Sequence, residues 1–127
     1  MKILVIDDDP AMTELLMLLL QSSTATVYTA NSGSEGITAS QRYQPDVIIL
    51  DLMMPEIDGW KVCQSIRQTS KVPILILSAL DSPGLVAKAL DAGADDYLIK
   101  PVPSGELVAR LNILMRRTRI DQPVYAQ

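Results

Sequence analysis

Four short runs of apolar residues constrain the fold of this chain more than any other feature of its sequence. They cover residues 3–6, 47–50, 74–77 and 97–99, and within each run the apolar residues are continuous rather than alternating with polar ones. Continuous runs of this length are typical of β-strands that are covered on both faces. A weaker run at residues 27–30 is expected to form an edge strand of the same sheet.

Segments with helical features follow these runs. Asp9-Pro10 is typical of a helix cap followed by the first helical residue, and Ser32 with Glu35 has the spacing of a capping box. Gly93 is suited to end a helix in the left-handed conformation. Alternating strands and helices predict an α/β fold in which helices cover a parallel sheet. The expected helices begin near residues 10, 33, 60, 83 and 107.

The size and charge of the chain limit what it can be. It has 127 residues, 48% of them hydrophobic, which is enough for the core of one domain. We expect this domain to span residues 1–119, and residues 120–127 to form a tail or the start of a linker. The formal net charge of −4 argues against direct binding of nucleic acid by this chain. No run suits a signal peptide or a membrane span, so we expect a cytoplasmic protein with no membrane partner.

The count of Cys and His limits the chemistry further. The sequence contains one Cys and no His. This excludes a disulfide framework, a Cys/His zinc site and acid–base catalysis by imidazole. Any chemistry must therefore use carboxylates, hydroxyls, lysine or arginine.

Polar side chains follow each of the four strong runs directly. They are Asp7 and Asp8 after the first, Asp51 after the second, Ser78 after the third and Lys100 after the fourth. Each of them alone is an ordinary residue of a strand end, a cap or a turn. Because ligands of parallel sheets bind outside the carboxyl ends of the strands, we expect all of them to converge at one edge.

The chemistry of this set points to phosphoryl transfer. Three carboxylates at one site repel each other, and a hard divalent cation such as Mg²⁺ relieves the repulsion. A lysine and a hydroxyl suit phosphate oxygens, and a carboxylate can serve as the nucleophile.

Four segments then match a known family. ILVIDDDP, DVIILDLMMPEIDGW, PILILSALD and GADDYLIKP occur in the order and at the spacing of the receiver domains of two-component response regulators, and the chain resembles this family over residues 1–119. The resemblance implies a flavodoxin-like fold with a five-stranded parallel sheet in the order 2-1-3-4-5 and helices on both faces. It also implies a phosphorylation-activated signalling switch that assists its own phosphorylation and dephosphorylation and is not an enzyme acting on an external substrate.

The resemblance assigns a role to each acidic residue. Asp51 matches the phosphoacceptor, which takes its phosphoryl group from a sensor histidine kinase. Asp8, Asp51 and the backbone carbonyl of Met53 match the direct ligands of Mg²⁺, and Asp7 matches a residue that acts on the ion through water. The absence of His from this chain fits a reaction in which the histidine belongs to the kinase.

The resemblance also assigns the other polar residues. Lys100 and Ser78 match the groups that bind the phosphoryl group, and the Lys100–Pro101 bond is expected to be cis. Ser78 and Tyr97 match a switch pair, in which the hydroxyl moves toward the phosphoryl group and the aromatic ring turns inward.

The C-terminal segment GADDYLIKPVPSGELVARLNILMRR further resembles receivers attached to winged-helix DNA-binding domains. The resemblance implies a homodimer of the phosphorylated protein, transcription regulation, and contact with DNA only through an output domain. Asp96 and Arg110 match one ion pair across that dimer, and Glu106 matches half of a second pair. The usual basic partner of Glu106 aligns with Val86, and a lysine follows at Lys88.

Two other functions compete with the switch. Asp7, Asp9, Ser78 and Lys100 loosely fit a phosphatase of the haloacid-dehalogenase type, but this leaves Asp51 unexplained and the chain has no room for a cap domain. A pseudo-receiver that only binds partners is disfavoured by the complete set of site residues.

Two apolar residues flank the expected phosphoryl group, Met53 and Leu80, where many receivers carry polar side chains that position water. We expect these apolar residues to slow hydrolysis of the phosphorylated state.

Overall fold

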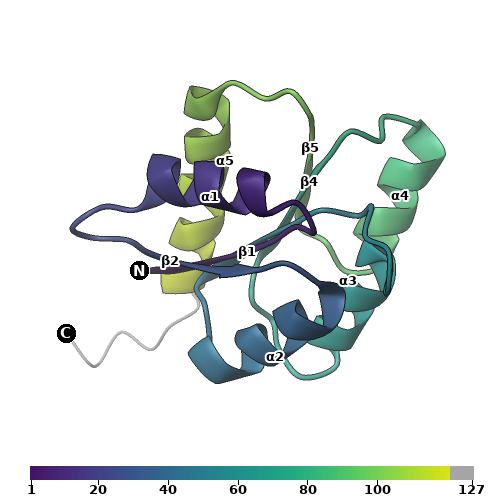
Figure 1. The fold of residues 1–127 in the computed structure, drawn as a ribbon, viewed down its shortest axis with the longest axis horizontal. Coiled ribbons are helices and arrows are strands. Elements are labelled where there is room, and N and C mark those ends of the chain that lie inside the picture. The colour runs from purple at the N-terminus through teal and green to yellow at the C-terminus, as the bar shows by residue number, and fades with distance from the viewer. Residues whose placement is uncertain (121–127) are drawn as a thin grey trace.

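The five apolar runs of the sequence form the five strands of one sheet. The computed structural model describes residues 1–120, with side chains through Arg117. Within this part, strands and helices alternate along the chain (Figure 1). The strands are β1 (Lys2–Ile6), β2 (Thr26–Ala30), β3 (Val47–Leu50), β4 (Ile74–Ser78) and β5 (Asp96–Ile99). The helices are α1 (Pro10–Leu20), α2 (Gly33–Tyr43), α3 (Gly59–Arg67), α4 (Pro83–Asp91) and α5 (Ser104–Ile120).

All neighbouring strands are parallel, and their order is β2-β1-β3-β4-β5. The predicted fold class and strand order are therefore confirmed. Every residue of β3 and β4 is buried, which explains why their runs are continuous, whereas the edge strands β2 and β5 are partly exposed.

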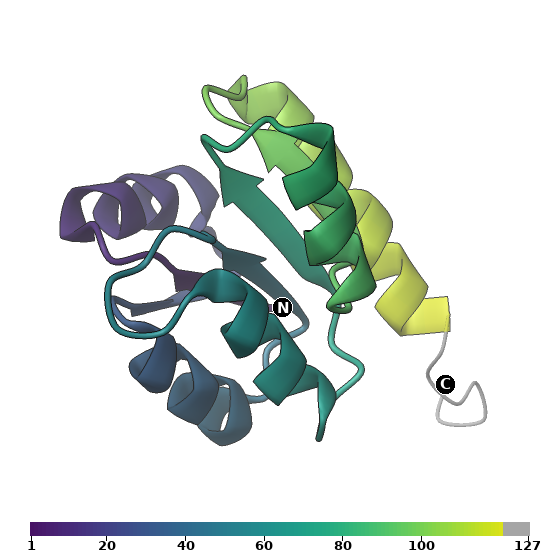
Figure 2. The same ribbon diagram turned by 90° about the vertical axis from the view of Figure 1, so that its right-hand side faces the viewer.

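Helices cover both faces of the sheet (Figure 2), and an apolar core lies on each face. On one face Leu4 and Ile48 share a core with residues of α2, α3 and α4, including the buried thiol of Cys63. On the other face Ile49 and Leu75 share a core with residues of α1 and α5. The helices that cover the two faces thus each contribute side chains to one of the two cores.

The helix caps agree with the sequence in most details. The Asp9 carboxylate accepts a hydrogen bond from the Ala11 N–H, and the Ser32 hydroxyl accepts one from the Glu35 N–H. The Glu35 carboxylate, however, accepts from the N–H of Asn31 rather than from that of Ser32, so the capping box is shifted by one residue. Gly93 has φ of +115°, as its place after α4 predicts.

The C-terminal helix is longer than predicted. It begins at Ser104, three residues before the expected start, because the exposed residues of its first turn give no apolar signal. It includes Ile120, while the rest of the expected tail, residues 121–127, lies outside the described residues. Within the described residues no helix has the length and apolar character needed to cross a membrane.

Candidate functional site

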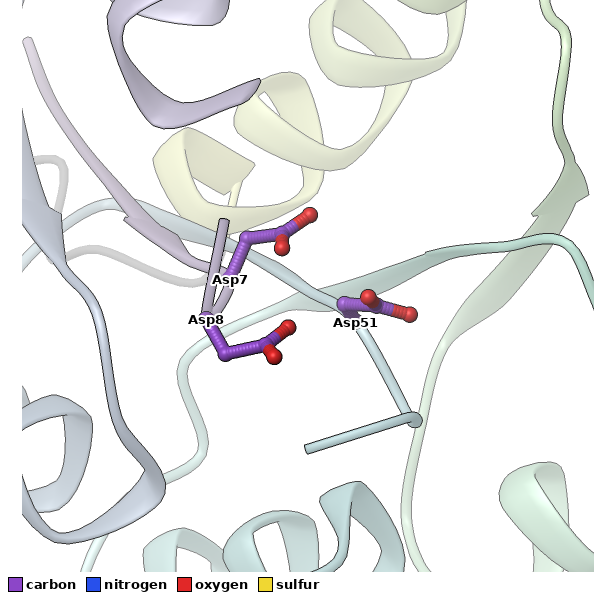
Figure 3. Close-up of side chains that lie close together, drawn as sticks. All are labelled: Asp7, Asp8 and Asp51. Atoms are coloured by element: carbon purple, nitrogen blue, oxygen red, sulfur yellow. The ribbon is translucent and has the colours of Figure 1, made fainter. Parts of the chain in front are cut away.

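The three acidic residues meet at the carboxyl edge of the sheet (Figure 3). β1 and β3 are paired so that Ile6 lies opposite Leu50, and the Asp51 N–H donates to the Ile6 carbonyl at 3.0 Å. The residues that follow the two strands therefore leave the sheet at the same level. Carboxylate oxygens of Asp7, Asp8 and Asp51 lie within 4.8 Å of one another. The predicted acidic cluster is thus brought together by the register of two neighbouring strands.

Lys100 adds one positive charge to this cluster. Its ammonium nitrogen lies 3.2 Å from Oδ2 of Asp7 and 3.8 Å from Oδ2 of Asp51. The Lys100–Pro101 peptide bond is cis, as expected. One ammonium group faces three carboxylates, so the site carries excess negative charge.

Burial makes this charge costly at Asp51, which is only 8% exposed. Burial raises the pKa of Asp51 above its ordinary value, and the neighbouring Asp7 carboxylate raises it further. The Lys100 ammonium and the backbone N–H groups of Met53 and Leu52 act in the opposite direction but do not cancel the effect. A hard divalent cation held by oxygen ligands would relieve this repulsion, so the donor set fits Mg²⁺.

Ser78 and Tyr97 both form hydrogen bonds to the backbone of Leu80, in the loop after β4. Ser78 is fully buried at the end of the strand, and its hydroxyl accepts from the Leu80 N–H at 3.3 Å. The Tyr97 hydroxyl donates to the Leu80 carbonyl at 2.7 Å. Burial raises the pKa of the Tyr97 phenol, and the carboxylates of Asp51 and Asp81 raise it further, whereas the Ser78 hydroxyl lowers it. The two predicted switch residues, on β4 and β5, are therefore linked through the same loop residue, Leu80.

The Met53 backbone N–H turns toward Asp51, while the residue is largely exposed to solvent. The Met53 N–H donates to Oδ1 of Asp51 at 3.3 Å, and the residue is 58% exposed. Leu80 is half-buried. The role of the Met53 carbonyl as a metal ligand stays a prediction.

The residues of the predicted dimer face pair with each other within one chain. The Arg110 guanidinium lies 3.1 Å from Oδ2 of Asp96 and 3.8 Å from Oε1 of Glu106. The Lys88 ammonium lies 4.3 Å from the centre of the Trp60 ring, so this lysine is engaged with α3.

One residue of the site gave no signal in the sequence. Asn31 follows β2, and its side-chain amide donates to the backbone carbonyl of Asp7 and to the Thr13 hydroxyl. An asparagine before a helix cap is an ordinary turn residue. Only the fold shows that its amide reaches the acidic loop 24 residues away.

Comparison with known proteins places the chain in a family. The family model described as "Response regulator receiver domain" matches residues 3–112. The chain therefore belongs to the response regulator receiver domains, whose known role is that of a phosphorylation-activated switch.

Two curated relatives are transcriptional or response regulators. The response regulator MprA of Mycobacterium leprae is 46% identical over 122 residues, which cover 95% of this chain and 54% of the relative. The DNA-binding dual master transcriptional regulator RpaA of Synechocystis is 43% identical over 125 residues, covering 95% of this chain and 52% of the relative. The chain thus spans about half the length of these relatives.

Solved structures of receiver domains also resemble this chain. The receiver domain of the Francisella response regulator 1452 is 37% identical with a TM-score of 0.86, covering 92% of this chain and 98% of that one. The BeF3-activated N-terminal receiver domain of Klebsiella pneumoniae RstA is 33% identical with a TM-score of 0.87, covering 91% and 99%.

Proposed function

We propose that this chain accepts a phosphoryl group on Asp51 from the phosphohistidine of a sensor histidine kinase. The observation that carries the proposal is the placement of a buried carboxylate beside two other carboxylates and the Lys100 ammonium, at the converging ends of β1, β3 and β5. These are the parts that phosphoryl transfer to a carboxylate requires.

In this reaction a carboxylate oxygen of Asp51 forms a bond to phosphorus as the P–N bond of phosphohistidine breaks. The electron pair of the broken bond remains on the imidazole nitrogen. Lys100 offsets negative charge on the phosphoryl oxygens, and the Ser78 hydroxyl donates a hydrogen bond to one of them. Asp8, Asp51 and the Met53 carbonyl would hold Mg²⁺ directly and Asp7 through water. When bound, the ion would supply positive charge to offset the charge of the transferring group.

The same contacts support a route from the site to the surface. When the Ser78 hydroxyl turns to the phosphoryl group, the loop that carries Leu80 changes position. The Tyr97 hydroxyl is bonded to the Leu80 carbonyl, so this change reaches β5 and the face formed by α4, β5 and α5. Phosphorylation thereby shifts the population of two arrangements of this face.

A surface beside the site suits the kinase. A cavity of about 400 Å³ lies between α1 and the segment after β5, and its lining includes Leu15, Leu19, Val102 and Lys100. Leu15 is 58% exposed. Because Lys100 also contacts Asp51, this apolar groove opens next to the proposed phosphoacceptor, and we assign it to the part of the kinase that carries the phosphohistidine.

The names of the relatives support an output in transcription. Both named relatives are regulators about twice as long as this chain, and one is named as DNA-binding. We assign to this chain control of transcription in the cytoplasm, through a homodimer formed by the α4–β5–α5 face and through an output domain that contacts DNA. The chain turns over no external substrate and assists only its own phosphorylation and dephosphorylation.

Substitution of the phosphoacceptor tests the proposal. Asp51→Asn should lose all phosphate uptake from acetyl phosphate or a phosphorylated kinase, because an amide is not a nucleophile. It should keep a cooperative unfolding transition. The control Asp91→Asn, at an exposed position on α4, should be phosphorylated like the wild type. Labelling of Asp51→Asn at the wild-type rate would show that the site is assigned wrongly.

A further inference from the structure

The loop that carries Asp7 and Asp8 is held from outside by Asn31. β1 and β2 end at Ile6 and Ala30, and one more backbone bond follows, from the Asp7 N–H to the Ala30 carbonyl at 3.1 Å. There the chain after β2 turns away into α2. The Asn31 amide supplies the next donor, to the Asp7 carbonyl at 2.9 Å.

Both sides of Asp7 are therefore fixed. The peptide group before it is held through its N–H by Ala30, and the peptide group after it is held through the carbonyl by Asn31. Because peptide groups are planar, these two bonds restrict both soft backbone dihedrals of Asp7. They also set the direction in which the chain enters Asp8.

Asn31 is itself positioned by two contacts, and one of its partners is held in turn. Its backbone N–H donates to the Glu35 carboxylate at 3.2 Å, and its side-chain amide also donates to the Thr13 hydroxyl at 3.1 Å. The Thr13 hydroxyl in turn donates to the Pro10 carbonyl. The amide is thus held between the starts of α1 and α2.

We propose that Asn31 is a positioning residue for the cation site: its amide fixes the Asp7–Asp8 peptide so that the two carboxylates face Asp51 before the ion arrives (Figure 3). This inference rests on the proposed function, because it assumes that the acidic cluster binds Mg²⁺. Mg²⁺ demands near-ideal octahedral geometry, so its affinity is sensitive to the orientation of each ligand. Partners that orient metal ligands typically change affinity by about 10- to 100-fold when removed.

The test compares two amide substitutions at opposite ends of β2. Asn31→Leu keeps the approximate shape of the side chain and removes its donors, and Asn31→Ser is a milder second variant. The matched control is Gln21→Leu, because the Gln21 amide oxygen accepts from the Val27 N–H near the other end of the strand. Thermal unfolding of each protein shows that it is folded at the temperature of the titration.

The readouts are the calorimetric Kd for Mg²⁺ and the Mg²⁺ dependence of phosphorylation by acetyl phosphate. Asn31→Leu should raise the Kd and the half-saturating Mg²⁺ concentration about tenfold, and Asn31→Ser should raise both by a smaller factor. Their maximal rate at saturating Mg²⁺ should stay within about twofold of the wild type, because the reacting groups are unchanged. Gln21→Leu should leave the Kd unchanged.

An unchanged Kd for Mg²⁺ in both Asn31 variants would overturn the inference. A rise of the Kd in Gln21→Leu equal to that in the Asn31 variants would also overturn it, because it would show a merely structural effect. In either case the wild type still binds Mg²⁺ and the proposed function stands. A wild type that neither binds Mg²⁺ nor accepts phosphate would instead overturn the proposed function, and the inference with it.

Discussion

The pKa of Asp51 differs from that of an ordinary aspartate because of the groups that surround it. Burial and the neighbouring Asp7 raise its pKa, and Lys100 only partly compensates. A group whose pKa is raised in the folded state binds its proton more tightly there than in the unfolded chain. Ionised Asp51 therefore lowers the stability of the protein without Mg²⁺, at any pH above its folded pKa.

Asp51→Asn should accordingly raise the unfolding midpoint at neutral pH in the presence of EDTA. The gain should shrink as the pH falls through the raised pKa of Asp51, since the wild-type carboxyl then takes up a proton and loses its cost. Added Mg²⁺ should reverse the order, because the wild type is stabilised by binding the ion. Thermal unfolding over a pH series checks this, and a variant less stable than the wild type in EDTA at neutral pH would contradict it.

We expect the apolar side chains of Met53 and Leu80 to slow hydrolysis of the phosphorylated state. Neither can orient a water molecule for attack on phosphorus, and the Leu80 carbonyl is engaged by the Tyr97 hydroxyl. We expect Met53→Asn to accelerate loss of the acyl phosphate by about threefold or more, because a polar group at this position can orient water.

The measurement is the decay of the phosphorylated protein after the donor is removed, with Met53→Leu as the apolar control. Decay of the wild-type acyl phosphate within seconds would refute the proposed role of these side chains.

Among the elements, the connection between α4 and β5 is held by hydrogen bonds from Arg67, at the end of α3. Its guanidinium donates to the Gly93 carbonyl at 2.9 Å, to the Asp95 carboxylate at 2.6 Å, and to the Ser70 and Val72 carbonyls. Asp95 also accepts from the Ile74 N–H at 2.8 Å. Arg67 thus joins α3, β4 and the loop before β5, at the end of the sheet opposite to Asp51.

Arg67→Lys should destabilise the protein by about 1–3 kcal/mol, because a lysine cannot serve several acceptors in a planar fork. Urea unfolding measures this change. The control Arg116→Lys, at an exposed position of α5, should stay within about 0.5 kcal/mol of the wild type. Equal stability of the two variants would show that the Arg67 contacts contribute nothing.

Sequence patterns predicted those parts of the fold whose cause is local. The buried strands appear as continuous runs, and Asp9 and Gly93 mark helix ends through their own conformational preferences. Asn31 and Arg67 were missed because each acts through its side chain on a backbone carbonyl distant in sequence, 24 and 26 residues away respectively. Such bonds depend on how the strands and helices are placed in the folded protein. No spacing of residues in the sequence therefore predicts them.

The candidate site was predictable for a related reason. Asp7, Asp51 and Lys100 each follow a strand directly and Ser78 ends one, and a parallel sheet brings the ends of its strands to one edge. The sequence could not predict which of these groups pair, since the contact of Lys100 with Asp7 at 3.2 Å joins residues 93 positions apart.

At the scale of the whole molecule, the α4–β5–α5 face combines apolar and charged groups. Leu90, Ile99 and Val108 are exposed there, and Asp96 and Arg110 pair beside them. Phosphorylation should favour a dimer through this face, in which Arg110 exchanges its partner within the chain for one on the second copy.

Ile99→Lys should abolish phosphorylation-dependent dimerisation, because it places a charge in the apolar part of this face. The matched control is Leu18→Lys, at a position on α1 that is 76% exposed, which should dimerise like the wild type. Sedimentation of the phosphorylated proteins decides between these outcomes, and a stable dimer of Ile99→Lys would rule out the α4–β5–α5 face.

Locating the acyl phosphate tests the central claim most directly. The protein is phosphorylated in the presence of Mg²⁺, the acyl phosphate is reduced with borohydride, and the modified residue is identified by peptide mass spectrometry. Modification at Asp51 alone is the predicted result. Modification at Asp7, as a phosphatase of the haloacid-dehalogenase type requires, or at no aspartate, would contradict it.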